Sequence, residues 1–103
     1  MILYNVTVNI DEDVRDEWLT WMKEVHIPDL LATGMFVSCK LARILAEEVG
    51  GNAYSVQYFA PSMEKVEQYM REFAPRLQAE HDKKFNGKYV AFRTLLDIVH
   101  QTE

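Results

Sequence analysis

The stretch that decides the fold is residues 18–36, which reads WLTWMKEVHIPDLLATGMF. Its first part carries apolar side chains at helical spacing. On a helix with about 3.6 residues per turn they fall within one stripe about 100° wide. That stripe consists of Val14, Trp18, Trp21, Met22 and Val25. The spacing predicts an amphipathic helix that packs both tryptophans into a core.

A proline and a glycine mark the end of this helix. Pro28 lacks a backbone N–H, so we expect the helix to be interrupted there. Residues 29–31 fit a further short turn, and Gly34 fits a C-cap. At the other end, Asp11 or Asp13 is suited to cap the helix N-terminus.

Four other stretches alternate between apolar and polar side chains with a period of two, which is the pattern of a β-strand. They are residues 2–10, 35–45, 53–60 and 88–99. The polar segment 47–52, centred on Gly50 and Gly51, predicts a hairpin loop between the second and third strands.

A second helix is predicted after Ser62, a residue type favoured at the N-cap. Pro75 predicts a kink or a restart within it, and residues 86–87 form a turn that ends it. Its apolar stripe consists of Val66, Met70, Phe73 and Leu77.

The predicted order is therefore β-α-β-β-α-β, which is typical of an α+β, ferredoxin-like domain. We expect a four-stranded antiparallel sheet with both helices on one face. Residues 1–103 are expected to form this single domain, because one core of this length folds alone.

The sheet would have one face towards the helices and one helix-free face. We expect the helix side to carry Val6, Val8, Val37, Leu41, Val56, Val90 and Phe92. The helix-free face is expected to carry Leu3, Asn5, Thr7, Asn9, Phe36, Ser38, Lys40, Ser55, Gln57, Phe59, Ala91, Arg93 and Leu95. This intermediate polarity favours a homodimer formed through the helix-free face, with a solvated face as the alternative.

Composition narrows the range of partners and locations. The net charge of −5 argues against nucleic acid as a partner, which calls for a basic face. Neither an apolar run of about 18 residues nor a basic leader is found, so we expect no membrane association. The single cysteine, Cys39, excludes an intrachain disulfide and favours a cytoplasmic location.

The stretch quoted above and the ending YVAFRTLLDIV, in this topology, resemble a family of short bacterial proteins described only as a domain of unknown function. That family resembles a branch of the dimeric α/β-barrel superfamily, with its antibiotic-biosynthesis monooxygenases, EthD-like proteins and muconolactone isomerase. The resemblance implies the fold and a dimer. It implies no catalytic residues beyond a weak match at His26.

His26 is the candidate catalytic residue. It lies at the edge of the first helix's apolar stripe, where a neutral imidazole could act as a general base. The alternative is a histidine that only bonds a carbonyl at the helix end. Cys39 is predicted to point into the core as an unreactive thiol.

Asn5, Gln57 and Arg93 are the candidate ligand-binding residues, because all three are expected on the helix-free face. Arg93 suits an anionic ligand, with an ion pair to Asp97 or to an acid across a dimer interface as the alternative.

The other two histidines are given no role. We expect His81 to be solvated near a helix end and His100 to lie in a fraying tail. Their spacing does not match a metal site, and neither a metal nor a cofactor is predicted.

Two classes of function remain open. One is a small-molecule binding protein with a cavity beside the helix-free face, or a cofactor-independent monooxygenase or isomerase that uses His26 as base and Arg93 to stabilise an anion. The other is a structural or regulatory dimer without a ligand.

Overall fold

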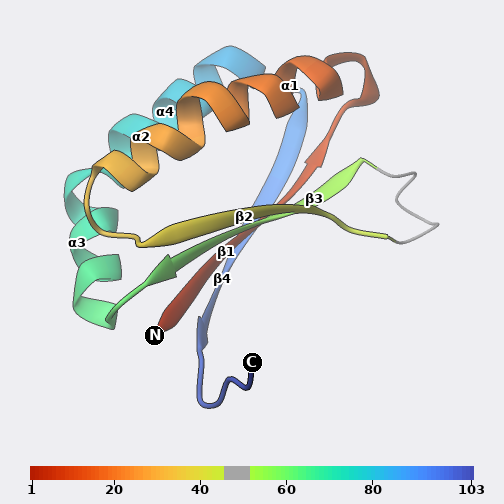
Figure 1. The fold of residues 1–103 in the computed structure, drawn as a ribbon. Coiled ribbons are helices and arrows are strands. Elements are labelled where there is room, and N and C mark those ends of the chain that lie inside the picture. Colours follow the sequence, from red (N-terminus) through yellow and green to blue (C-terminus); the bar gives the residue numbers. More distant parts are fainter. Residues whose placement is uncertain (46–51) are drawn as a thin grey trace.

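The structure is a computed structural model that describes residues 1–45 and 52–103. A sheet of four antiparallel strands has the order β2-β3-β1-β4. Its strands are β1 (Ile2–Ile10), β2 (Ser38–Arg43), β3 (Ala53–Ala60) and β4 (Tyr89–Asp97). All helices cover one face of the sheet (Figure 1), so the predicted ferredoxin-like fold is confirmed. The predicted loop at 47–52 lies, apart from Asn52, outside the described residues.

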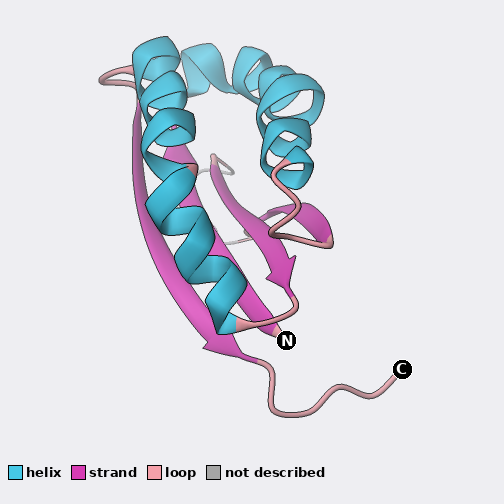
Figure 2. Ribbon diagram, turned by 90° about the vertical axis from the view of Figure 1, so that its left-hand side faces the viewer, coloured by secondary structure: helices cyan, strands magenta, loops and turns pink. Residues whose placement is uncertain are grey.

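The helices form two columns that run across the sheet (Figure 2). The first column is a series of short elements, and the second is split in two. The first contains η1 (Glu12–Val14), α1 (Arg15–Trp21), the π-helical turn η2 (Met22–His26) and α2 (Ile27–Ala32), and the second contains α3 (Met63–Glu72) and α4 (Ala74–Phe85). None of the helices in the described parts of the chain is long and apolar enough to cross a membrane.

The π-helical turn lies directly before Pro28. In an α-helix the proline ring would clash with the carbonyl group of Glu24, four residues earlier. In the wider π-turn the N–H of Ile27 instead bonds the carbonyl of Met22, five residues earlier. The predicted interruption is therefore a widened turn rather than a break, and Gly34, at φ +79°, follows the last turn as expected.

This turn changes which side chains of the first column are buried. The buried residues are Trp18, Met22, His26 and Leu30, at a constant spacing of four. The predicted stripe was wrong at Val25, which is 40% exposed, because the extra residue in the π-turn moves the buried face by one position. Asp11 holds the N-cap position of η1 as predicted but makes no side-chain cap bond, whereas Asp13 pairs with Lys88.

The second column follows the prediction at its start. Ser62 is the N-cap, and its hydroxyl accepts the N–H of Lys65 at 3.3 Å. Pro75 lies in the first turn of α4, where a proline is tolerated, so a new helix begins there. The predicted stripe was wrong at Met70, which is exposed, because Tyr69 occupies the buried position in α3.

The last strand presents the opposite face to the one predicted. β4 pairs with β1 so that Arg93 lies opposite Val6, on the helix side of the sheet. Ala91 and Leu95 share this side with Arg93. The apolar residues that were expected inside, Val90 and Phe92, face away from the helices and are 71% and 63% exposed.

A similar correction applies just before β2. Phe36 was expected on the helix-free face and Val37 in the core, but Phe36 is buried and Val37 is exposed. The strand begins only at Ser38, so these two residues do not follow its alternation. Cys39 points to the helix side as predicted, since it pairs with buried Tyr58.

Stability measurements can test which residues of the first helical column are buried. Leu30→Ala is expected to lower the free energy of unfolding by about 2–5 kcal/mol, because it empties a buried position. Val25→Ala on the same column should change it by no more than about 0.5 kcal/mol. Urea denaturation measures both, and equal losses would contradict the burial pattern.

Candidate functional site

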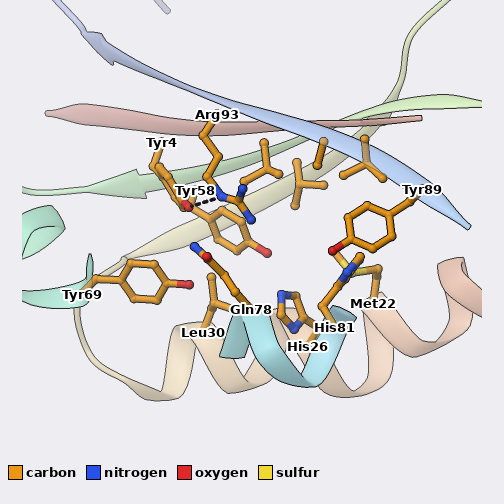
Figure 3. Close-up of a pocket in the computed structure, with 14 residues that line it drawn as sticks. Tyr4, Met22, His26, Leu30, Tyr58, Tyr69, Gln78, His81, Tyr89 and Arg93 are labelled. Atoms are coloured by element: carbon orange, nitrogen blue, oxygen red, sulfur yellow. Dashed lines mark hydrogen bonds between the residues drawn. The ribbon is translucent and has the colours of Figure 1, made fainter. Parts of the chain in front are cut away.

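A small cavity of about 40 Å³ lies between the sheet and the two helical columns (Figure 3). Side chains from β1, β3 and β4 form its roof, and side chains from the helices form its floor. Its lining residues are Tyr4, Val6, Val8, Met22, His26, Leu30, Val56, Tyr58, Tyr69, Gln78, His81, Tyr89, Ala91 and Arg93. The cavity is therefore on the helix side of the sheet, not beside the helix-free face.

On the sheet side, Arg93 and Tyr4 form a polar pair at the cavity. The Nε–H of Arg93 donates to the hydroxyl of Tyr4 at 3.0 Å. Tyr4 is buried, and this burial raises the pKa of its phenol although the guanidinium opposes the shift. Arg93 itself is exposed, so its charge sits at the edge of the cavity.

Two further tyrosines direct their hydroxyl groups into the cavity. Tyr58 comes from β3 and Tyr69 from α3, and Figure 3 shows both hydroxyls pointing inwards. Burial raises the pKa of each phenol, so both stay protonated at neutral pH. They can therefore donate hydrogen bonds to a molecule in the cavity.

On the helix side, the π-turn brings His26 into the cavity wall. Its ring stacks on Trp21, with the ring centroids 4.9 Å apart and the planes 24° from parallel. Its Nδ1 atom is buried without a hydrogen-bond partner among the described residues. Burial, together with nearby His81 and Arg93, lowers the pKa of His26 to about 4.

His81 also faces the cavity, and the prediction that it is solvated was wrong. It is only 8% exposed, because α4 runs on beyond Pro75 and keeps His81 in line with Leu77. The indole Nε1–H of Trp18 donates to its Nε2 at 2.9 Å. An indole can only donate, so the proton of the neutral imidazole is on Nδ1.

The environment of His81 keeps it neutral. Burial and the charge of Arg93 lower its pKa to about 4, although Asp82 opposes the shift. The ring also meets Tyr89 edge-on, with the centroids 4.5 Å apart. Both cavity histidines are thus uncharged at neutral pH.

The lining of the cavity carries a single charge. Arg93 is the only charged side chain among its lining residues, and neither Asp nor Glu lines it. Within the described residues, no group of three or more His, Cys, Asp or Glu side chains is placed to hold a metal ion. The arrangement is therefore suited to an anionic or hydrogen-bond-accepting molecule.

Comparison with known families identifies the chain. Residues 1–99 match the domain of unknown function DUF4286. The chain belongs to the DUF4286 family. No curated protein shows significant sequence similarity to it.

Several solved structures resemble this DUF4286 protein in fold. A dimeric ferredoxin-like protein from an uncultured marine organism has a TM-score of 0.73 at 15% identity, covering 100% of this chain and 99% of the other. MhuD, in a variant with two manganese protoporphyrin IX molecules per active site, has a TM-score of 0.75 at 13% identity, covering 100% and 99%. An antibiotic biosynthesis monooxygenase has a TM-score of 0.63 at 13% identity, covering 97% and 100%.

The structure separates the residues that the sequence analysis grouped together. His26 and Arg93 line one cavity, from opposite layers. Asn5 and Gln57 instead lie opposite each other on the helix-free face, where both hydrogen-bond with Ser55. The predicted position of Arg93 beside them was wrong, because β4 has the opposite phase.

Sequence reasoning missed the following lining residues: His81, Gln78, and the four cavity tyrosines Tyr4, Tyr58, Tyr69 and Tyr89. One signal for His81 was available, since it follows Leu77 by four residues within a helix that Pro75 starts rather than breaks. Tyr4 and Tyr58 alternate in phase with Val6 and Val56, which were correctly expected on the helix side. Nothing in the sequence, however, distinguishes a tyrosine packed in a core from one lining a cavity.

The low pKa values of the two histidines predict a dependence of stability on pH. Each histidine has a pKa of about 4 in the folded protein and about 6.5 when unfolded. The unfolded chain therefore binds more protons between these values, and folding stability falls as the pH drops through this window. At pH 5 the loss is about 2 kcal/mol for each histidine.

Urea denaturation at pH 7.5 and pH 5 measures this loss. His81→Gln should remove part of the difference between the two pH values. His100→Gln, in the exposed tail, should leave it unchanged. An equal pH dependence in wild type and His81→Gln would contradict the assignment.

Proposed function

We propose that this DUF4286 protein is a homodimer that binds a small molecule in the cavity between the sheet and the helices. The observation that carries the proposal is the cavity itself, a space inside the core in which arginine, tyrosine and histidine side chains lie among apolar ones. Protein interiors rarely leave such spaces unless water or a ligand fills them.

The size of the cavity limits its occupant. Its volume of about 40 Å³ has room for a few water molecules or a group of a few heavy atoms. Pockets for drug-sized ligands are larger, at about 300 Å³ and above. A bulkier ligand therefore requires the helical columns to move apart from the sheet.

The structural comparisons support ligand binding by a protein of this fold. One similar structure holds porphyrins in its active site, and another is named as a monooxygenase. The two histidines, neutral at the cavity wall, are suited to contact a polar ligand group.

The helix-free face supports the dimer. Its outer strand β4 exposes Val90, Phe92 and Leu96, and large apolar side chains in a row on a sheet face are typical of an interface. We propose a second copy of the chain as the partner, since a similar structure is described as dimeric. The proposal also places the protein in the cytoplasm, where a lone cysteine such as Cys39 is common.

Ligand binding is tested by filling the cavity. Ala91→Phe adds a ring to a lining residue and is expected to abolish thermal shifts caused by cavity ligands. Ala79→Phe, at an exposed position of α4, should leave them intact. The screen contains small carboxylic acids, their amides, phenol and haemin, and retained shifts in folded Ala91→Phe would refute the cavity as the site.

The dimer is tested by a charge on the helix-free face. Phe92→Lys should convert a particle of twice 12.0 kDa, about 24 kDa, into a monomer, because it buries an unpaired charge in an apolar contact. Val25→Lys, at an exposed position of the helical layer, should leave the mass unchanged. Light scattering measures the mass, and a wild-type monomer at micromolar concentration would contradict the dimer.

A further inference from the structure

The guanidinium of Arg93 is partly engaged and partly open. Its Nε–H is held by the hydroxyl of Tyr4, which fixes the plane of the group at the cavity. Within the described residues Arg93 forms no ion pair; the pairs found there join Arg15, Arg71, Arg76, Lys84 and Lys88 to neighbouring acids. Asp97, one of the two alternative partners, is therefore not used, and among the described residues the two terminal nitrogens have no acidic partner.

The groups around Arg93 add donors and no negative charge. The hydroxyls of Tyr58 and Tyr69 point into the same space (Figure 3), and the amide of Gln78 reaches into it from α4. The Nδ1 atom of His26 is the one buried side-chain polar atom in the described chain without a hydrogen-bond partner. The cavity thus offers hydrogen-bond donors and one cation, and no carboxylate lines it.

A single fixed guanidinium favours one class of anion. Its planar fork matches the two oxygens of a carboxylate, and such bidentate pairs are stronger than single hydrogen bonds. A phosphate dianion would bring about two negative charges against one lining cation. The charge balance therefore favours a monoanion.

A carboxylic acid and a phenol differ in pKa, and this difference decides which of them enters the cavity as an anion. A carboxylic acid has a pKa of about 4 and is already ionised at neutral pH. A phenol, with a pKa of about 10, would have to give its proton to a histidine whose pKa is about 4. That transfer is unfavourable by a factor of about 10⁶. A phenol would thus enter as a neutral molecule and leave the charge of Arg93 unmatched.

We propose that the ligand of this cavity is an organic carboxylate, held by the two terminal nitrogens of Arg93 with the Tyr58 and Tyr69 hydroxyls as further donors. This assignment rests on the proposed function, since it names the chemical class of the molecule bound there. Apolar walls formed by Val6, Val56 and Leu30 would receive the hydrocarbon part of the acid.

The test compares acids with neutral molecules of the same shape. Acetate, butanoate and benzoate are titrated into the full-length protein by calorimetry, each beside its amide, with phenol as a further neutral probe. At least one acid should bind about tenfold or more tightly than its amide, because hydrogen bonds to a charged group are stronger by this order.

Variants of Arg93 test the contact itself. Arg93→Gln should weaken the acid about tenfold or more and leave the amide unchanged, whereas Arg93→Lys should restore part of the affinity because it keeps the charge. Arg71→Gln removes an exposed arginine far from the cavity and should have no effect. Thermal unfolding of each variant confirms that it is folded.

The outcomes distinguish this inference from the proposed function. If an amide or phenol binds as tightly as the acids, or if folded Arg93→Gln binds them unchanged, the carboxylate assignment is overturned while the cavity remains a binding site. If none of the small acids binds but haemin does, Arg93→Gln decides, because haemin itself carries two propionate carboxylates: an unchanged affinity for haemin in the folded variant overturns the assignment. If no molecule of the screen binds, the proposed function fails with it.

Discussion

The geometry of this protein depends on one backbone constraint, the proline at position 28. Its missing N–H and its ring cannot be placed in the interior of a regular α-helix, and the π-helical turn over Met22–His26 accommodates them. The extra residue in that turn moves the buried face so that His26, rather than Val25, meets the sheet. A local steric conflict in the backbone thus decides which titratable group lines the cavity.

Burial then determines the protonation states of the side chains that line the cavity. Removing an imidazole from water disfavours its charged form, and the nearby guanidinium of Arg93 acts in the same direction. Both histidines are therefore neutral, while the tyrosines remain protonated. One cation remains among neutral donors and acceptors, and this imbalance favours a monoanionic ligand over a cation or a metal.

The two faces of the sheet have separate roles. The helix side holds the core and the cavity, with Arg93 at its edge. The helix-free side joins a polar centre, in which Asn5 and Gln57 both bond Ser55, to exposed apolar residues such as Phe92 on β4. Because side chains alternate along a strand, β4 places Arg93 on the helix side and Phe92 on the helix-free face.

The sequence by itself determined the order of elements, because period-two and helical spacings are local properties of the chain. It also determined the cap at Ser62 and the start of a new helix near Pro75. Only the tertiary structure decided the phase of β4, since an apolar alternation looks the same whether it faces a core or an interface. Likewise, His81 meets Trp18 across 63 positions, and only the packing of α4 against the first helical column brings them together.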